Sequence, residues 1–466
     1  DNFSLSAGEE GAMKILLVRP RPHKETIGLQ HVMICEPLEL EYLAGNIPAE
    51  LSDQVETVIY DMILEKDSFE NILLREKPEL VAFTGYITHV GTIRKMAESV
   101  KKLLPLAMTA VGGVHAEVVT DDFISPYIDL VFGWNGVKGF NYAVKNLLEG
   151  RTVGEIKEGL KSMNSDPYDL RLPPPDRSLV SRYRQKYYYM FHNPCALIKT
   201  SFGCPYNCSF CFCKEITRGS FYKRPIEEVV EEIATIPERE IYIVDDDFLY
   251  DEERLYRFIG LLRENRIDKR FLVYGRADFI SSHPQLMEEL FSVGLRAVIV
   301  GIESVRSEDL KDYRKGTTRE INEECIRTLK KIGIELYATL IIPMDFSAAD
   351  FRELSGWLVS QGMTFVNLQP LTPLPGTEIF TEYEGKLIIK REDHHLWDMA
   401  HVALKPDKMS IREFYYQILK AYWRVIMRPG NMIRLLKTYG FRENFKMLVG
   451  SQRVSLQYFG KIMRGI

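Results

Sequence analysis

Three cysteines near the middle of the chain form the pattern with the clearest chemistry. Cys204, Cys208 and Cys211 have a C-x3-C-x2-C spacing, which lets three thiolates surround one small inorganic centre. A four-iron cluster needs four ligands, so three cysteines leave one iron open to a substrate or cofactor. A structural zinc site normally takes four side-chain ligands at paired spacings that differ from this one. The spacing therefore favours an open-site [4Fe–4S] cluster.

Two other interpretations of the cysteine loop stay open. Cys213 and Cys195 could complete a zinc site, and Cys208 with Cys211 alone could form a redox pair. The sequence has no second C-x2-C pair, and the aromatic Phe210 just before Cys211 suits packing beside a cofactor. Both features favour the cluster.

The elements around this loop indicate where it lies in a fold. A strand-like run at residues 196–202 precedes it, and a helix-like run begins at Pro225. In a repeating βα unit this places the loop at the carboxyl end of a parallel sheet, where α/β enzymes carry their chemistry. Further strands are predicted at residues 240–244, 271–274, 297–301, 335–342 and 364–369, with helices between them. Six such strands predict a partial (β/α)6 barrel.

Four residues follow successive strands of this predicted barrel. Asp245 follows the second strand, Arg276 the third, Glu303 the fourth and Pro343 the fifth. A carboxylate at such an edge can accept hydrogen bonds from ribose hydroxyls or an ammonium group, and an arginine can hold a carboxylate. The run of residues 245–247 can also be a solvated loop or a helix cap.

The N-terminal part predicts a second α/β sheet. Strands at residues 14–18, 55–60, 80–84, 108–112 and 130–133 alternate with helices, which argues for a parallel doubly wound sheet. Such sheets bind ligands beyond the carboxyl ends of their strands. There, Gly112 and Gly113 remove side chains where a flat, bulky ligand could approach, and the Thr84 hydroxyl could bond a heterocyclic nitrogen. No G-x-G-x-x-G or phosphate-binding loop is present, which disfavours dinucleotides and triphosphates.

Three motifs together resemble a known family. The cysteine pattern after Gly203, the stretch Gly301-Ile-Glu-Ser304 and the stretch Leu371-Thr-Pro-Leu-Pro-Gly-Thr377 resemble the radical S-adenosylmethionine (SAM) superfamily. With the N-terminal α/β domain, residues 13 to 385 are similar to its cobalamin-binding branch. The resemblance implies three cofactors: a [4Fe–4S] cluster, SAM and cobalamin.

The resemblance also implies which residues bind them. The cluster would be held by Cys204, Cys208 and Cys211. SAM would contact Phe210, Asp245, Arg276, Glu303 and Pro343. Cobalamin would contact Thr84, Gly85, Gly112, Gly113, Val114 and Gly133. The chain lacks a D-x-H-x-x-G signature, so cobalamin would lack a histidine as its lower axial ligand. His23, His31, His89 and His115 are isolated in the sequence and are expected to be loop or surface residues rather than ligands.

The activity implied by the resemblance is C-methylation of an unactivated carbon in a small molecule or lipid. A 5′-deoxyadenosyl radical would abstract hydrogen, and methylcobalamin would deliver the methyl group. An electron donor such as flavodoxin or ferredoxin is expected, and no side-chain acid or base is required. Radical cyclisation or rearrangement without methyl transfer is the alternative within the family. A zinc-bound sensing or scaffold protein is the alternative outside it.

Composition agrees with an enzyme of this kind. The chain has 466 residues, 45% of them hydrophobic, and a net charge of −5, so nothing points to nucleic acid. Seven cysteines fit a reducing compartment. Residues 1–12 lack the basic start and apolar core of a signal peptide, and no run of 18 apolar residues is present. A cytoplasmic location is expected.

Four parts are predicted along the chain: a cobalamin-binding Rossmann-like domain at 13–150, a linker at 151–194, the partial barrel at 195–385 and a helical domain at 386–466. The proline triplet at 173–175 favours extended chain in the linker. Residues 424–466 hold nine Arg or Lys against Glu443 alone, interleaved with apolar residues. A basic amphipathic tail of this kind can rest on anionic lipid, or it can be a solvated helical face.

Overall fold

The computed structural model describes residues 11–163 and 172–464, and these form two compact units. Unit 1 takes its described residues from Asp1–Thr26, Glu36–Gln185 and Glu392–His395. Unit 2 takes them from Ile27–Cys35, Lys186–Arg391 and Leu396–Ile466. Part of the predicted linker at 151–194 and most of residues 1–12 lie outside the described residues. The four-part division of the chain stays a prediction.

Unit 1 contains a five-stranded parallel sheet. Its strands are β1 (Met13–Arg19), β3 (Val55–Asp61), β4 (Leu80–Thr84), β5 (Met108–Gly112) and β6 (Leu130–Val131), in the order β3-β1-β4-β5-β6. Strands β1 and β4 are almost wholly buried, which is typical of the continuous apolar strands in a parallel sheet covered on both faces. The strand order reverses between β1 and β4. In doubly wound sheets this switch point is where ligands bind.

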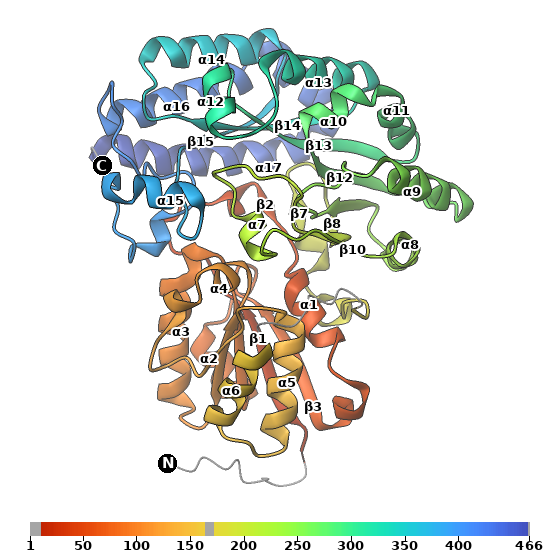
Figure 1. Ribbon diagram of the computed structural model, residues 1–466, viewed down its shortest axis with the longest axis vertical. Helices are drawn as coiled ribbons and strands as arrows, with labels where there is room; N and C mark the ends of the chain where they lie inside the picture. The colour runs from red at the N-terminus through yellow and green to blue at the C-terminus, as the bar shows by residue number, and fades with distance from the viewer. Residues whose placement is uncertain (1–10, 164–171, 465–466) are drawn as a thin grey trace. The chain divides into compact units, whose positions relative to one another are not determined.

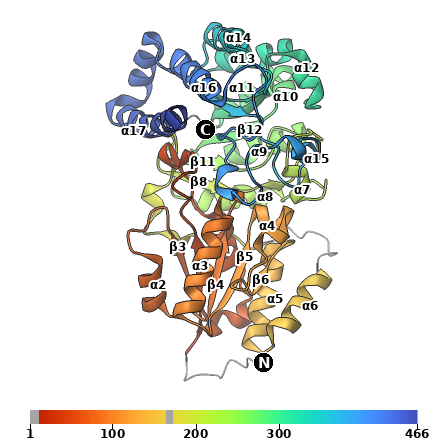
Figure 2. The ribbon, with the colours of Figure 1, turned by 90° about the vertical axis from the view of Figure 1, so that its left-hand side faces the viewer.

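Helices cover both faces of this sheet (Figures 1 and 2). They are α1 (Leu38–Gly45), α2 (Phe69–Glu76), α3 (Val90–Leu103), the short α4 (Val114–Val118), α5 (Gly136–Leu148) and α6 (Val153–Met163). In α3, Val90, Ile93, Ala97 and Val100 are buried at helical spacing, so one apolar face packs on the core. α2 and α3 pack together, as do α5 and α6.

Helix α6 was not expected, because it lies within the stretch predicted to be a linker. Ile156 is fully buried, and the Leu160 side chain lies beside Gly139 of α5. The run of residues with helical apolar spacing is short, and a proline-rich segment follows it. Its helical period therefore extends over too few residues to stand out in the sequence.

Unit 2 contains a six-stranded parallel sheet in sequential order. The strands are β8 (Cys195–Ile198), β11 (Glu240–Ile243), β12 (Arg270–Gly275), β13 (Leu295–Glu303), β14 (Glu335–Ile342) and β15 (Phe365–Pro370). Every neighbouring pair is parallel, and β8 and β15 are the two edges. The outer helices are α8 (Ile226–Thr235), α9 (Glu252–Glu264), α10 (Ala277–Ser282), α11 (Pro284–Ser292), α12 (Ser307–Asp312), α13 (Arg319–Ile332) and α14 (Ala348–Ser360). The predicted fold class, a Rossmann-like sheet followed by a partial barrel, is confirmed.

The chain continues beyond the barrel with α15 (Glu378–Tyr383), α16 (Ile411–Ile426) and α17 (Pro429–Arg464), which confirms the helical C-terminal segment. α16 packs on α14 and β15, and α17 runs along α16 (Figure 1). Gly440 has φ +73° and ψ 174°, so α17 consists of two helical segments, residues 429–439 and 441–464. A small antiparallel pair in unit 2 joins β2 (Met33–Ile34) to β7 (Tyr188–Tyr189).

Candidate cofactor sites

The cysteine loop follows β8 at the carboxyl edge of the six-stranded sheet. It begins after β9 (Ser201–Phe202), which pairs with β10 (Tyr222–Lys223), and it runs into α7 (Cys213–Ile216). Gly203 precedes the first cysteine with φ +79°. A Cβ at Gly203 would lie 2.2 Å from the Ser220 carbonyl oxygen and 2.4 Å from Thr217 Oγ1. Only glycine therefore fits this turn.

Two aspartates at the end of β11 fix the start of this loop. The buried Asp245 carboxylate accepts the Thr200 N–H at 2.7 Å and the hydroxyls of Thr200 and Ser201. Asp246 accepts the Gly203 N–H at 3.1 Å. Asp245 as a SAM contact stays a prediction. In this structure its carboxylate is hydrogen-bonded to the segment that positions Cys204.

The thiols of the loop influence one another. Burial raises the pKa of Cys204 to about 12, and the nearby charges of Asp247 and Cys211 act in the same direction. Burial also raises the pKa of Cys208, against the positive charges of Lys315 and Arg276. A hydrogen bond with the Cys213 thiol lowers the pKa of Cys211. In the metal-free chain Cys204 and Cys208 are therefore protonated at neutral pH, and metal binding would release their protons.

The three sulfurs of the loop are too widely spaced to hold a single ion in this structure. Among the described residues, only His23, Glu25 and His395 bring three ligand atoms within 4.8 Å of one another. Tetrahedral zinc, with Zn–S distances of about 2.3 Å, would hold sulfurs about 3.8 Å apart. A cuboidal cluster bonds each thiolate to a different iron and needs a wider spacing. The donor set of Cys204, Cys208 and Cys211, three thiols on one loop, is the set that an open-site [4Fe–4S] cluster takes, and their role as its ligands stays a prediction.

Glu303 ends β13 in an unusual backbone conformation. Its φ is +59°, and the register between β13 and β14 shifts between Gly301 and Glu303. Glu303 Oε1 accepts a hydrogen bond from Lys315 Nζ at 2.9 Å, and both side chains are buried. Burial disfavours the lysine charge, but the Glu303 carboxylate outweighs it and raises the pKa of Lys315. A Cβ at Gly301 would lie 2.1 Å from Glu303 Oε1, so a side chain there would displace the ends of the Glu303 and Lys315 side chains.

The other predicted SAM residues also lie at this edge of unit 2. Arg276 forms a bidentate pair with Asp278 at 3.0 and 2.9 Å, and its guanidinium lies 3.7 Å from the centre of the Tyr206 ring. Phe210 packs edge-on against Tyr313, with ring centres 5.6 Å apart. The Pro343 carbonyl, directly after β14, accepts the Phe346 N–H at 3.3 Å. The role of each as a SAM contact stays a prediction.

Asp247 is the residue at this edge that sequence reasoning did not select. It is 2% exposed, and neither carboxylate oxygen has a hydrogen-bond partner of normal geometry among the described residues. Burial raises its pKa to about 8, although Arg276 and Lys315 act in the opposite direction. Neither Asp247 nor Lys315 had a sequence signal of its own, because an acidic triplet and a lysine in a charged loop both look like solvated surface.

The predicted cobalamin residues follow β4, β5 and β6 of unit 1. Thr84 Oγ1 donates to Glu39 Oε1 at 3.0 Å, and Gly113 has φ +98°. A Cβ at Gly113 would lie 2.9 Å from Thr84 Oγ1. Val114 begins α4, and Gly85 and Gly112 flank the same loops. A Cβ at Gly133 would lie 2.9 Å from Thr120 Oγ1. These contacts with cobalamin also stay predictions.

His89 provides a test of whether this edge fits a large polar ligand. It lies in the connection after β4, beside the switch point, and it is buried. Burial lowers its pKa to about 4, so the ring is neutral. Nδ1 accepts the Tyr86 N–H at 3.2 Å, which leaves the proton on Nε2. Nε2 is buried without a hydrogen-bond partner in the described chain. The Nε2–H group of His89 can therefore donate a hydrogen bond to a ligand. Together with the Gly112-Gly113 turn, this donor fits cobalamin, which is rich in amide groups.

Replacing Gly113 with alanine is expected to weaken cobalamin binding at least tenfold. The φ and ψ of Gly113, +98° and 175°, suit only glycine, so the free energy of unfolding should also fall by about 1–3 kcal/mol. Titration with hydroxocobalamin, followed by absorbance, and urea unfolding would measure the two effects. Gly91→Ala in α3 is the control, because its Cβ meets nothing within 4 Å. Wild-type cobalamin affinity in Gly113→Ala would contradict the assignment.

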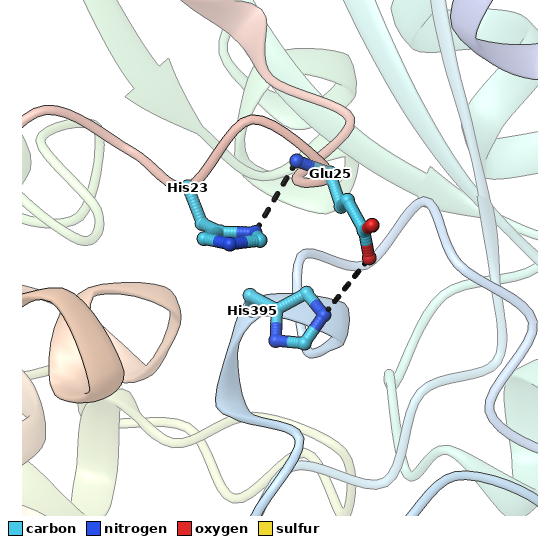
Figure 3. Close-up of side chains that lie close together, drawn as sticks. All are labelled: His23, Glu25 and His395. Carbon is cyan, nitrogen blue, oxygen red and sulfur yellow. Dashed lines mark hydrogen bonds and ion pairs between the residues drawn. The ribbon is translucent and has the colours of Figure 1, made fainter.

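A second group of ligand atoms lies in unit 1 (Figure 3). His23 and His395 have ring centres 4.5 Å apart, and His395 Nε2 lies 3.3 Å from Glu25 Oε2. His23 is isolated in the sequence, because 372 positions separate it from His395. The three ligand atoms are close enough for one divalent ion. Each side chain already has a partner within the group, since His23 Nδ1 accepts the Glu25 N–H at 3.3 Å.

Two family models match the chain. Residues 198–358 match the radical SAM superfamily, and residues 26–137 match the B12 binding domain. The chain is 27% identical to a hopanoid C-3 methylase of Methylococcus capsulatus, over 88% of this chain and 79% of that protein. It is 22% identical to an anaerobic magnesium-protoporphyrin IX monomethyl ester cyclase of Rubrivivax gelatinosus, over 96% of this chain and 82% of that protein.

Two solved structures share the fold. One is the radical SAM methyltransferase TsrM of Kitasatospora setae, with a TM-score of 0.69, 16% identity and coverage of 97% of this chain and 100% of that one. The other is the cobalamin-dependent radical SAM enzyme OxsB, with a TM-score of 0.64, 13% identity and coverage of 96% and 72%. Both matched domains occur in the predicted order along the sequence. The chain therefore carries a B12 binding domain at residues 26–137 and a radical SAM domain at residues 198–358.

Proposed function

We propose that this chain transfers a methyl group to an unactivated carbon of a lipid or other small molecule. The observation that carries the proposal is the pairing, in one chain, of a B12 binding domain with an open three-cysteine loop at the edge of a radical SAM barrel. When bound, SAM and the cluster supply a carbon radical, and cobalamin supplies a carrier for the methyl group.

The chain's own residues bind and orient these groups. Asp245 and Asp246 hold the segment before Cys204, so the thiols are presented from a fixed turn. The buried Asp247 carboxyl group, whose pKa is about 8, would ionise beside a bound ammonium group and accept its hydrogen bonds. The Glu303–Lys315 pair keeps charge at the edge of the sheet without exposing it to water. No residue needs to act as a general acid or base.

A lipid substrate is supported by the similarity to the hopanoid C-3 methylase, which extends over 88% of this chain. The sequence identity of 27% supports a class of substrate rather than one compound. An electron donor such as flavodoxin or ferredoxin, and a cytoplasmic location, stay predictions.

A second candidate function is radical cyclisation without methyl transfer. The similarity to the cyclase of Rubrivivax gelatinosus, over 96% of this chain, favours it. The two reactions consume SAM differently. Methyl transfer uses one SAM as methyl donor and another as radical source, whereas cyclisation uses SAM only as radical source.

Product analysis under anaerobic conditions separates these candidates. With SAM, cobalamin, a reductant and a polycyclic lipid, we expect S-adenosylhomocysteine and 5′-deoxyadenosine to form in equal amounts with methylated lipid. Mass spectrometry would measure all three. Product formed with 5′-deoxyadenosine but without coupled S-adenosylhomocysteine would favour cyclisation. Purified protein that contains zinc but neither iron nor sulfide would reject both reactions.

A further inference from the structure

The last helical segment of unit 2 has an apolar stripe on its solvent side. At about 100° per residue, the members of this stripe fall within about 80° of the helix circumference. They are Phe441, Phe445, Leu448, Leu456, Phe459 and Met463. Phe441 is 77% exposed and Leu456 is 68% exposed. Single exposed apolar residues are common, but six on one face of a helix are not, and here the exposed Gln452 separates them into two groups, residues 441–448 and 456–463.

The opposite side of the same helix is held firmly by unit 2. Gly450 lies against the His31 carbonyl, where an added Cβ would come within 2.0 Å of the oxygen. Tyr458 is buried beside Tyr415, with ring centres 5.9 Å apart. Lys446 Nζ lies 3.2 Å from the centre of the Tyr188 ring. Because these contacts fix the rotation of the helix, the apolar stripe cannot turn inward.

Basic residues border the stripe on one side. Arg442, Arg453 and Arg464 are exposed and lie about 100–140° around the helix from Phe441. None of the three forms an ion pair within the described part of the chain. Residues 424–466 carry a net charge of +8, and since the whole chain carries −5, the other residues carry −13. Half of this positive excess, +4, lies in residues 441–464, which hold Arg442, Lys446, Arg453, Lys461 and Arg464 against Glu443.

This charge distribution indicates which of two partners, a second copy of the chain or a lipid bilayer, fits the apolar stripe. A symmetric dimer with antiparallel helices would bring the two basic borders together, and like charges at an interface oppose association. An anionic bilayer offers an apolar layer beneath a negative surface, which matches a stripe with a basic border. No helix in the described ranges has the length and apolar character to cross a membrane. The fit is therefore to the surface of a bilayer.

We propose that residues 441–464 dock on an anionic lipid surface, with the apolar stripe in the acyl boundary and Arg442, Arg453 and Arg464 at the headgroups. This docking deepens the proposed function, because an enzyme on a membrane surface reaches a lipid substrate. The biological role of the docking therefore rests on the proposed function. The docking itself depends only on the stripe and its charges.

Vesicle flotation tests the proposal with the full, cluster-loaded protein. We expect it to float with vesicles of phosphatidylcholine mixed with phosphatidylglycerol, and to bind pure phosphatidylcholine vesicles far less. Replacing Phe441, Phe445 and Phe459 with asparagine should reduce binding at least tenfold. Replacing Arg442, Arg453 and Arg464 with glutamine should reduce binding to the anionic vesicles by roughly 100-fold. High salt should reproduce the second effect.

Matched controls isolate the stripe from general loss of apolar or basic surface. Leu106→Asn with Ile124→Asn removes side chains that are 70% and 71% exposed in unit 1. Lys157→Gln, Lys311→Gln and Lys331→Gln remove three exposed charges elsewhere. Both control variants should bind vesicles like the wild type.

Two results would overturn the docking proposal. One is wild-type protein that stays unbound to anionic vesicles, or stripe variants that bind as well as wild type. The other is a wild-type dimer in light scattering that the phenylalanine variant converts to monomer, which would make a second copy the occupant. The proposed function and the proposed docking are tested separately, because SAM cleavage to 5′-deoxyadenosine is measured without vesicles. Lost cleavage with retained docking would reject the function alone, and the reverse would reject the docking alone.

Discussion

Replacing Cys204 with alanine is expected to give a protein that holds little iron and cleaves SAM at least roughly 10,000-fold more slowly than wild type. The wild-type chain supplies three thiols, and losing one leaves a cluster with two protein ligands. Cys208→Ala and Cys211→Ala should have the same effect, since each thiol would bond a different iron. Iron and sulfide content, visible absorbance and 5′-deoxyadenosine formation would measure it.

Cys213→Ala is the matched control for these variants. Cys213 lies two positions beyond Cys211, and the two thiols share a hydrogen bond, so it is the nearest alternative ligand. A cluster built on the C-x3-C-x2-C spacing should keep full iron content in Cys213→Ala. Iron lost equally from Cys213→Ala and Cys204→Ala would indicate a different ligand set. Zinc bound by the wild type and lost from Cys213→Ala would restore the zinc interpretation.

The fold could be predicted from the sequence because both sheets are parallel and buried. Their strands are short apolar runs separated by amphipathic helices, and this alternation is visible without any long-range information. The strand order of unit 1 and the rotation of the helical segment at residues 441–464 could not be predicted in this way. Both depend on contacts between distant residues, such as Gly450 against His31.

The candidate site was predictable only where spacing carries the information. The cysteine loop and the glycines of its turn have fixed spacings, whereas the partners of charged side chains do not. The sequence could not separate Asp245, Asp246 and Asp247, which are adjacent and chemically identical. The structure separates them, because Asp245 and Asp246 accept hydrogen bonds from the loop and Asp247 does not. The pairing of His23 with His395 was equally invisible, since only the folded chain brings them together.

Asp247→Asn and Asp245→Asn should change stability in opposite directions, although both are isosteric substitutions two positions apart. The pKa of Asp247 in the folded chain, about 8, lies above that of an unfolded aspartate. The folded chain therefore binds more protons between these values, and its stability falls as pH rises from about 4 to about 8. An amide in place of this carboxyl group does not titrate, so Asp247→Asn should raise the free energy of unfolding by about 2–5 kcal/mol above pH 8 and by little near pH 4. Asp245→Asn should lower it by about 1–3 kcal/mol, because one of three donors loses its acceptor.

SAM binding should be weakened by Asp247→Asn and little changed by Asp245→Asn, because in the proposed function the Asp247 carboxyl group ionises beside the bound cation and holds its ammonium group. We expect Asp247→Asn to lower kcat/KM for SAM cleavage roughly 100-fold or more, mainly through KM, since a buried charged partner is lost. Asp245→Asn should act through the position of the cysteine loop, lowering kcat and iron content with little change in KM. Urea unfolding of the cluster-free chain at pH 5 and pH 8.5, and steady-state kinetics of the loaded enzyme, would measure both. An Asp247→Asn variant that is less stable than wild type at pH 8.5, or that keeps its affinity for SAM, would show that Asp247 has a partner of its own and that another group holds the ammonium.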